Sequence, residues 1–418
     1  MGRFVINGLN KRVSGQIPIR GAKNASLKAF AASLLFKEDV LIKNVPLIDD
    51  VKNIIKLLED FGVEVDRVSK RSFRIQARNI AKTEFDDEIA RYFRASIVLS
   101  GPLLSREGKV SFPHPGGCVI GARPIDIFLE GFQKMGAVVR WHHNQYHIQA
   151  KALRGADIVF NIPSVTATET LMMAAVLAKG KTILHNAACE PEVAALAEFL
   201  NSCGAKIKGA GTHTIIINGV KKLRRGVFST MPDRIEAGSL AILAALCGKR
   251  IRLTNCNPEH LWVPLKLLRQ AGVNVRCNRT SIEIQPGRLL KSVNVITKEY
   301  PGFPTDLQAP FTVLLTQARG EAMVFETIFE GRLNYIHDLN RLGANIIMCD
   351  PHRAVVLGPT PLKGREIESP DLRAGLGFVI AALISKGRSV INNIYHIDRG
   401  YEQIEKRLQA IGLDIKRV

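Results

Sequence analysis

Residues 401–415 have the sequence YEQIEKRLQAIGLDI. The apolar residues recur at intervals that place them on one face of a helix: Tyr401, Ile404, Leu408 and Ile411. Gly412 follows and is expected to end the helix, because glycine adopts the left-handed conformation of a helix C′ position without the steric cost of a Cβ. This pattern, an amphipathic helix ended by glycine and followed by a short strand, occurs six times. The glycines are 68 to 74 residues apart: Gly62, Gly136, Gly204, Gly272, Gly343 and Gly412. A repeat architecture is therefore predicted.

A second helix, rich in small residues, is expected upstream of the amphipathic helix in each repeat. Small side chains on more than one face indicate a helix that packs on several sides and is therefore buried. Clear examples are residues 25–35, 168–178 and 373–385, and the short strands expected after them are residues 40–42, 182–184 and 389–391. Each repeat is thus predicted to be a βαβαββ unit, and the fold class to be α/β.

The number of repeats predicts the domain organisation. Three repeats fit one domain of about 200 residues, so six predict two similar lobes with a cleft between them. A strand expected at residues 4–7 completes the last repeat better than the first. We therefore predict a C-terminal lobe of residues 1–22 and 232–418, and an N-terminal lobe of residues 23–231.

Composition limits the classes of function. The net charge of +20 predicts attraction to anions, although Lys and Arg are dispersed along the chain. No apolar run approaches the roughly 20 residues that span a bilayer, and no signal peptide is recognised, so we expect a cytoplasmic protein without membrane insertion. The odd number of cysteines, seven, argues against a disulfide framework. Five of them stand in apolar segments and are expected to fill the core: Cys203, Cys247, Cys256, Cys277 and Cys349.

The common cofactor motifs are absent from the sequence. It contains no Walker A P-loop, no His-Glu-x-x-His and no dinucleotide-binding fingerprint next to a predicted strand. The ten histidines form no ligand spacing, and His142 and His143 are expected in a solvated turn. We therefore predict neither a metal nor a cofactor.

The second repeat departs from the others in a loop at residues 112–124. Two of its sister repeats run directly from strand to helix, whereas this one inserts prolines and glycines around Cys118. A cysteine in a loop is exposed, and the nearby Arg123 would favour its thiolate. A reactive cysteine is the preferred interpretation, and a plain surface loop is the alternative.

Polar residues stand at the expected starts of the small-residue helices. Asp233, Asp306, Asp371 and Ser164 follow prolines there, and Lys23-Asn24 holds the corresponding place in the first repeat. Such residues are good N-caps, which is the simplest explanation for each of them. Helix N-termini also bind anions, and basic residues recur close to these turns. The pattern predicts that one phosphorylated substrate is surrounded by Lys23, Arg123, Arg373 and Arg399.

Seven motifs together resemble the enolpyruvyl transferases that act on UDP-N-acetylglucosamine, along essentially the whole chain. They are Gly21-Ala22-Lys23-Asn24-Ala25, Arg94-Ala95-Ser96, Pro115-Gly116-Gly117-Cys118, Gly121-Ala122-Arg123-Pro124, Phe303-Pro304-Thr305-Asp306, Asp371-Leu372-Arg373-Ala374 and Tyr395-His396-Ile397-Asp398-Arg399-Gly400-Tyr401-Glu402. The resemblance implies two inside-out α/β barrels, the enolpyruvyl transferase fold, and the first committed step of peptidoglycan synthesis. The substrates would be phosphoenolpyruvate and UDP-N-acetylglucosamine, and phosphate would be released.

The resemblance also implies roles for individual residues. Cys118 would donate a proton to C3 of phosphoenolpyruvate and could form a covalent adduct with it, and Asp306 would take the proton of the sugar hydroxyl. Lys23, Arg123 and Arg399 would hold the phosphate and carboxylate, with support from Arg94, Arg332 and Arg373. The remaining residues expected to contact the substrates are Asn24, Pro124, Ile125, Asp126, Ile127, Ser164, Val165, Ile328 and Asp371.

Two rival functions are weighed against this one. The 3-phosphoshikimate enolpyruvyl transferases share the six-repeat plan, but they lack the loop that carries Cys118. A basic RNA-binding or RNA-end-processing repeat protein would fit the charge, but it would need an aromatic stacking surface or a concentrated basic stripe. Two Trp and six Tyr, scattered along the chain, provide no such surface, so no nucleic-acid partner is expected.

Overall fold

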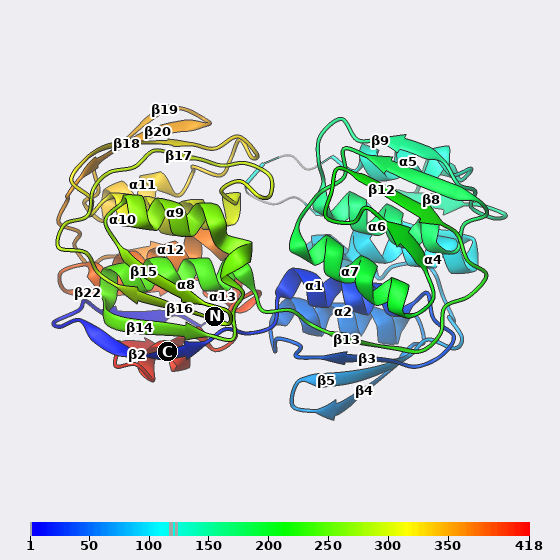
Figure 1. The fold of residues 1–418 in the computed structure, drawn as a ribbon, viewed down its shortest axis with the longest axis horizontal. Helices are drawn as coiled ribbons and strands as arrows, with labels where there is room; N and C mark the ends of the chain where they lie inside the picture. The colour runs from blue at the N-terminus through cyan, green and yellow to red at the C-terminus, as the bar shows by residue number, and fades with distance from the viewer. Residues whose placement is uncertain (1, 117–119, 122–123) are drawn as a thin grey trace. The chain divides into compact units, whose positions relative to one another are not determined.

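The computed structural model describes residues 2–116, 120–121 and 124–418. These residues divide into two compact units that are described separately here (Figure 1). The first unit contains the chain up to Arg20, the pair Ile120 and Gly121, and all residues from Pro232 onward. The second unit contains the remaining described residues between Gly21 and Met231.

Each sheet of the second unit gathers the strands of one repeat. In the first repeat, β13 (Gly226–Ser229) pairs in parallel with β3 (Val40–Lys43), and β5 (Ser72–Gln76) pairs antiparallel with β3 and β4 (Glu64–Ser69). The third repeat has the same plan, with the order β11 (Lys206–Lys208), β12 (Thr214–Asn218), β10 (Lys181–His185) and β9 (Asp157–Val159).

The sheet of the second repeat is smaller. Its described strands are β6 (Lys109–Pro113), β8 (Gln145–Gln149) and β7 (Val138–His142), in that order. An isolated parallel bridge between Glu84 and Ser111 stands where the other sheets have a fourth strand. His143 and Asn144, both at positive φ, form the turn between β7 and β8. The turn expected at His142-His143 is therefore displaced by one residue, because His142 is the last residue of β7 and pairs with Gln145.

The first unit repeats this arrangement. Its sheets have the orders β15-β16-β14-β2, β17-β18-β20-β19 and β21-β22-β1-β23. The bounds are β1 (Phe4–Asn7), β2 (Val13–Pro18), β14 (Gly248–Thr254), β15 (Asn274–Asn278), β16 (Ser281–Gln285), β17 (Val295–Ile296), β18 (Gly320–Phe325), β19 (Ile346–Asp350), β20 (Arg353–Gly358), β21 (Glu366–Glu368), β22 (Arg388–Asn392) and β23 (Ile415–Arg417). The strand at residues 4–7 pairs antiparallel with β22 and β23, so the prediction that it completes the last repeat is confirmed.

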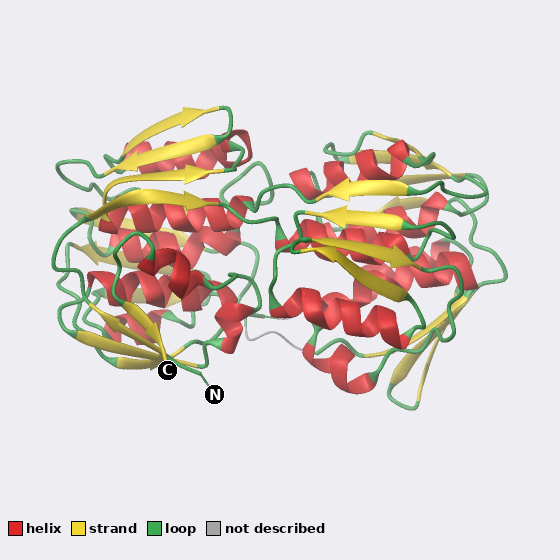
Figure 2. Cartoon of the chain, turned by 90° about the horizontal axis from the view of Figure 1, so that it is seen from below, coloured by secondary structure: helices red, strands yellow, loops and turns green. Residues whose placement is uncertain are grey.

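The small-residue helices form the interior of each unit. They are α1 (Lys23–Ser33), α4 (Ser100–Glu107) and α6 (Val165–Val176) in the second unit, and α8 (Arg234–Cys247), α10 (Gln308–Leu315) and α12 (Leu372–Ile384) in the first. In α12, every residue from Arg373 to Leu383 is buried, which confirms the prediction made from its small side chains. Each fully buried Leu or Phe contributes about 1.5–3 kcal/mol. The strands lie outside the helices within each unit (Figure 2), which is the inside-out arrangement expected from the resemblance.

The other helices cover or connect these elements. The amphipathic α-helices that precede the repeated glycines are α2 (Asp49–Asp60), α5 (Asp126–Lys134), α7 (Pro191–Ser202), α9 (Trp262–Gln270), α11 (Ile336–Arg341) and α14 (Ile404–Gln409). The shorter elements are α3 (Asp87–Tyr92), α13 (Tyr395–Asp398) and the 3-10 helices η1 (Arg94–Leu99), η2 (Pro258–Leu261) and η3 (Thr305–Leu307). Among the described residues, no helix is long and apolar enough to cross a membrane.

The repeated glycines have the backbone conformation that the sequence predicts. All six lie at positive φ, between +83° and +104°: Gly62, Gly136, Gly204, Gly272, Gly343 and Gly412. At Gly136 and Gly204 an added Cβ would meet no atom within 4 Å. Backbone conformation, rather than lack of space, is therefore the reason for glycine at these two positions.

The prediction for the cysteines is only partly right. Cys203, Cys247 and Cys256 are buried, but Cys277 and Cys349 are exposed. Cys277 lies on β15 and Cys349 on β19, each at the edge of its sheet, where both side chains are exposed. An apolar neighbourhood in sequence does not identify the buried residues of such a strand, because successive side chains point to opposite faces.

Candidate active site

Asp306 lies between two arginines in the first unit. It belongs to the one-turn helix η3, just before α10. Arg332 donates a hydrogen bond from Nη2 to Asp306 Oδ1 at 2.6 Å, and Arg373 approaches Oδ2 with Nε at 3.0 Å and Nη2 at 2.9 Å. Both arginine side chains are buried, whereas 28% of the Asp306 side chain remains exposed. The Asp306 carboxylate thus bridges two buried arginines and is itself accessible to solvent.

The charges of this cluster set its protonation. Burial alone would raise the pKa of Asp306, but the positive charges and hydrogen bonds of Arg373 and Arg332 outweigh it and hold this pKa well below its usual range. Burial would likewise lower the pKa of each arginine, but Asp306 raises both. Asp306 is therefore ionised throughout the physiological pH range and acts as a hydrogen-bond acceptor.

A second layer of hydrogen bonds fixes Arg373. Its Nη1 donates to the hydroxyl oxygen of Tyr401 at 3.1 Å, and that hydroxyl lies 3.4 Å from the hydroxyl of Ser239. Tyr401 is completely buried, which raises the pKa of its phenol. The sequence pattern placed Tyr401 on an apolar helix face, but Tyr401 lies between α13 and α14 (Ile404–Gln409), outside both helices. The pattern also gave no sign of its polar contact, so its link to Arg373 was missed.

Buried Glu326 orders the neighbouring segment. Its Oε1 accepts hydrogen bonds from the backbone N–H groups of Ile328 at 2.9 Å and Phe329 at 3.2 Å. Its Oε2 accepts a hydrogen bond from the hydroxyl of Thr305 at 2.8 Å. One carboxylate therefore positions both Ile328 and the residue that precedes Asp306. Nothing in the spacing of the motifs pointed to Glu326.

The other predicted residues of the first unit lie around the start of α12 and the end of α13. Asp371 caps α12 and accepts hydrogen bonds from the backbone N–H groups of Arg373 at 2.7 Å and Ala374 at 3.1 Å. Arg399 is half-buried and follows α13. Burial and the charge of Arg399 lower the pKa of His396, while Asp371 opposes them.

In the second unit, Lys23 pairs with a buried carboxylate. Its Nζ lies 2.5 Å from Asp50 Oδ2, and the Asp50 side chain is 1% exposed. Lys23 and Asn24 are the first two residues of α1, whose N-cap is Ala22. Asn24 is therefore not the N-cap of this helix, and no side chain caps it. Asp50 lies in the first turn of α2 and holds Lys23 in place.

Arg94 and Ser164 hold local backbone in the same unit. Arg94 Nη1 donates to the carbonyl oxygens of Pro115 and Gly116, both at 3.3 Å, and so fixes the described part of the proline- and glycine-rich loop. Ser164 caps α6 by accepting a hydrogen bond from Ala167 N at 3.3 Å, and Val165 begins that helix.

The residues that follow this loop are also in the second unit. Pro124 and Asp126 are exposed, Ile127 is half-buried, and Ile125 is 2% exposed within the core. Cys118 and Arg123 lie outside the described residues. Among the residues that the structure describes, no group of three or more His, Cys, Asp or Glu side chains could hold a metal ion.

The fold places the chain in a class of proteins. The sequence profile of the family described as "EPSP synthase (3-phosphoshikimate 1-carboxyvinyltransferase)" matches residues 9–408. The enolpyruvyl transferase NikO from Streptomyces tendae has a similar structure, with a TM-score of 0.89 and 22% identity, over 100% of this chain and 99% of that one. An EPSP synthase from Acinetobacter baumannii has a TM-score of 0.77 and 18% identity, over 100% of both chains. The fold is that of the enolpyruvyl transferases.

Similar sequences narrow this class. UDP-N-acetylglucosamine 1-carboxyvinyltransferase of Solibacter usitatus is 45% identical over 100% of both chains. The proteins of this name from Koribacter versatilis and Coxiella burnetii are 43% and 42% identical, over 100% of this chain and 97% and 96% of theirs. The chain therefore belongs to the UDP-N-acetylglucosamine 1-carboxyvinyltransferase family of enolpyruvyl transferases.

Proposed function

We propose that this protein transfers the enolpyruvyl group of phosphoenolpyruvate to the 3′-hydroxyl of UDP-N-acetylglucosamine and releases phosphate. The supporting observation is the full-length identity of 42–45% to relatives that bear this activity in their names. The reaction is the first committed step of peptidoglycan synthesis, and we place it in the cytoplasm. The described cysteines are free, which is usual for cytoplasmic proteins.

The chemistry proceeds by addition and elimination. The sugar oxygen forms a bond to C2 of phosphoenolpyruvate while C3 gains a proton and the hydroxyl loses its own. The bond between C2 and the phosphate oxygen then breaks, and C3 gives up a proton to restore the double bond. An acid near C3, a base near the hydroxyl and fixed cations around the phosphate are required.

Asp306 is assigned to the sugar hydroxyl. Its exposed carboxylate can accept a hydrogen bond from this hydroxyl while Arg332 and Arg373 hold it in position. A carboxylate with a lowered pKa is a weak base in the free protein. It can nevertheless take the proton late, because the hydroxyl becomes strongly acidic as its oxygen bonds to C2. We therefore assign Asp306 both to the orientation of the hydroxyl and to its deprotonation.

The remaining roles are assigned by charge and by the family motifs. Cys118 donates the proton to C3, and Lys23, Arg123 and Arg399 hold the phosphate and carboxylate. Asp50, paired with Lys23, keeps that lysine oriented. Arg94 contacts the backbone that leads to Cys118 and so supports the placement of this residue. Asn24, Ser164, Val165 and Ile328 line the site of the sugar nucleotide, and Pro124, Ile125, Asp126, Ile127 and Asp371 support it.

A substrate exchange tests the proposed function. The family profile that matches the chain is described by its activity on 3-phosphoshikimate, so this substrate is the alternative. Purified protein is given phosphoenolpyruvate with either UDP-N-acetylglucosamine or 3-phosphoshikimate, and phosphate release is measured. We expect release with the sugar nucleotide alone. Release with 3-phosphoshikimate, or with neither acceptor, would refute the proposal.

A labelling experiment tests the role of Cys118. A fosfomycin-like epoxide is added to the wild type and to the Cys118→Ser variant, and the labelled peptide is identified. We expect the wild type to be alkylated at Cys118 and inactivated, and the variant to escape this label. Exposed Cys277 and Cys349 serve as internal references for nonspecific alkylation. Labelling of other cysteines alone, with loss of activity, would remove Cys118 from the mechanism.

A further inference from the structure

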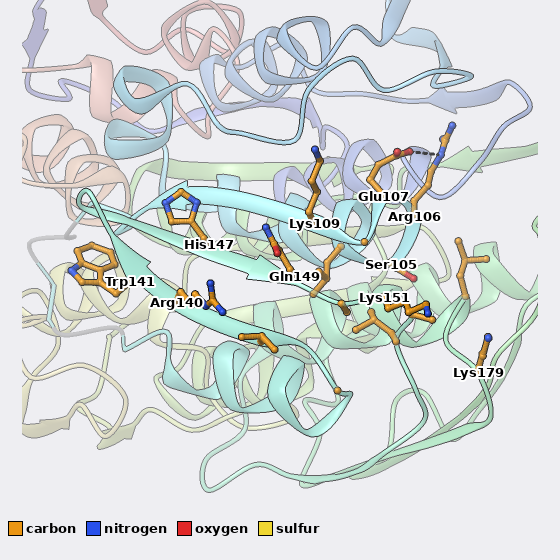
Figure 3. Close-up of a pocket in the computed structure, with 18 of the residues that line it drawn as sticks. Ser105, Arg106, Glu107, Lys109, Arg140, Trp141, His147, Gln149, Lys151 and Lys179 are labelled. Carbon is orange, nitrogen blue, oxygen red and sulfur yellow. Dashed lines mark ion pairs between the residues drawn. The ribbon is translucent and has the colours of Figure 1, made fainter.

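The second repeat contains a groove of about 1420 Å³ that shares no lining residue with the candidate active site. The groove lies where β6 and β7 begin and β8 ends, and it continues over the end of α4 and the turn after α6 (Figure 3). It is larger than the groove of about 810 Å³ that Trp262 and Cys277 line in the first unit. Neither the proposed reaction nor the motifs of the family account for it.

The groove carries positive charge that no nearby acid balances. Lys109, Arg140, Lys151 and Lys179 are exposed, and none of them has an ion-pair partner among the described residues. The one acidic side chain of the lining, Glu107, lies 3.4 Å from Arg106. Arg106 itself is a structural residue, because it donates hydrogen bonds to the backbone carbonyls of Leu34 and Phe36. The four exposed cations remain available to a ligand.

A sheet of the first unit shows that uncompensated charge is not a general property of these outer faces. The sheet β15-β16-β14 also carries several arginines on its outer face. There, Arg250 pairs with Glu283 at 2.9 Å. The hydrogen bond from Arg250 lowers the pKa of Glu283, and the charges of Arg250 and Arg276 lower it further, while burial opposes them. An acidic partner for the exposed Arg250 is thus built into that face, whereas Glu107, the one acid that lines the groove of the second repeat, pairs with Arg106.

An aromatic ring stands at one end of the groove. Trp141 is 53% exposed, and its other side packs against Tyr146 with 4.5 Å between the ring centroids. Figure 3 shows Trp141 and Arg140 at the hairpin end, and Lys151 and Lys179 toward the opposite end. Gln149 lies between these ends, and His147 stands opposite Arg140 on the neighbouring strand. His147 Nδ1 shares a hydrogen bond of 2.8 Å with the hydroxyl of Ser111.

We propose that this groove binds a soluble polyphosphate, with a nucleoside polyphosphate as its natural class of ligand. Lysine ammonium groups are compact point charges that suit phosphate oxygens, and a string of them suits a chain of phosphates. The exposed face of Trp141 suits a nucleoside base. A nucleic acid would require a series of stacking platforms, whereas Trp141 is the one Trp, Tyr or Phe residue in the described lining. A small polyphosphate is therefore the better fit.

Binding can be measured without an assay of activity. The chain has two tryptophans, so Trp262→Phe leaves Trp141 as the single indole reporter. Inorganic tripolyphosphate is titrated by calorimetry and ATP by Trp141 fluorescence, at 150 mM salt. We expect saturable binding of both. The triple variant Lys109→Gln, Lys151→Gln and Lys179→Gln should weaken both at least tenfold. The Trp141→Ala variant, measured by calorimetry, should bind ATP more weakly and tripolyphosphate as tightly as before.

A charge-matched control separates a built site from general attraction. The exposed lysines Lys206, Lys208 and Lys221 of the same unit are replaced together by Gln, which removes the same charge elsewhere. Affinity should be retained in this control, and thermal unfolding should confirm that both triple variants fold. Absence of saturable tripolyphosphate binding, equal losses in the two triple variants, or displacement by UDP-N-acetylglucosamine would overturn the proposal. If the protein binds oligothymidylate more tightly than tripolyphosphate or ATP, and the triple variant at Lys109, Lys151 and Lys179 loses this binding, then the groove is a nucleic-acid site and the proposal is wrong.

Discussion

At the scale of single residues, Asp306 shows how one carboxylate can be both structural and accessible. It neutralises two buried arginines, yet more than a quarter of its side chain stays exposed. Removal of one partner from such a cluster leaves the other charges buried without compensation. The stability of the first unit and the orientation of the proposed acceptor therefore depend on the same ion pairs.

The Asp306→Asn variant should lose both properties. It keeps the size of the side chain but removes the charge that balances Arg332 and Arg373, so we expect a cost of about 3 kcal/mol in the free energy of unfolding. We also expect a fall in kcat of at least 10²-fold, in line with the loss of a general base. Urea unfolding and steady-state kinetics measure the two effects. Unchanged kcat in a destabilised variant would assign Asp306 a structural role alone.

Because the pKa of Asp306 is lowered, the difference in unfolding free energy between the wild type and Asp306→Asn should depend on pH in a defined way. A carboxylate whose pKa is lower in the folded protein contributes stability that is present above its ordinary pKa of about 4. That stability is lost as the pH falls through the lower, folded-state value. The gap in unfolding free energy between the wild type and Asp306→Asn should therefore be constant from pH 8 to pH 5 and shrink at lower pH. A gap that narrows already between pH 7 and pH 6 would contradict the assigned ion pairs.

Sequence alone identified the polar residues at the helix starts, but it could not assign their contacts. The N-cap prediction is right for Ser164, Asp233 and Asp371 and wrong for Asn24 and Asp306. A cap depends on local backbone, which the sequence specifies. The partners of Asp306 come from positions 26 and 67 residues further along the chain. Contacts of that kind depend on how the repeats pack together.

At the scale of elements, two buried helices of the second unit are joined by an ion pair whose carboxyl group has a raised pKa. Lys28 of α1 lies 2.8 Å from Glu169 of α6, and both side chains are buried. Burial raises the pKa of Glu169 to about 7, although Lys28 opposes this shift. The folded protein therefore holds this proton more tightly than the unfolded chain does.

Glu169→Gln should change the pH dependence of stability. Between pH 5 and pH 8 the wild type must release the Glu169 proton while folded, so its stability should fall relative to the variant, by up to about 3 kcal/mol. Urea unfolding at both pH values measures this, with exposed Glu198→Gln of α7 as the control. A difference between wild type and Glu169→Gln that is the same at pH 5 and pH 8 would contradict the raised pKa.

The repeated glycines offer a second test at this scale. Gly204→Ala should destabilise by about 1–2 kcal/mol, because an L-residue is strained at its φ of +104° although the space is open. Gly62→Ala should cost more, because its Cβ would also lie 2.9 Å from the Cβ of Ala81. Gly204→Asn is the matched control, since Asn tolerates this conformation better. Equal stability of Gly204→Ala and the wild type, measured by urea unfolding, would refute the backbone explanation.

Helices and strands were the most predictable level of the structure. The segments expected at residues 40–42, 182–184 and 389–391 form β3, β10 and β22, each one or two residues longer than predicted. Periodicity and glycine placement are local signals, so they can be recognised in the sequence without knowledge of the fold. The division of the second repeat's buried segment into η1 and α4 could not be predicted, because the same small residues suit both kinds of helix.

At the scale of the whole molecule, repetition explains how one chain builds two similar units. Strand β13 completes the sheet of the first repeat, and β1 completes that of the last, so each unit is closed by a strand distant in sequence. The sequence predicted the six repeats from their glycines. It did not reveal the basic groove, because its cations are spread over residues 109–179 and gather only when β6, β7, β8 and the ends of α4 and α6 fold together.

The product formed in deuterated water tests the central claim most directly. The purified protein is incubated with phosphoenolpyruvate and UDP-N-acetylglucosamine in D₂O, and the products are examined by proton NMR. Our account predicts an enolpyruvyl ether at the 3′-oxygen of the sugar, with deuterium at its vinyl carbon, because C3 gains and then loses a proton. Recovery of both substrates unchanged, or a vinyl carbon without deuterium, would contradict it.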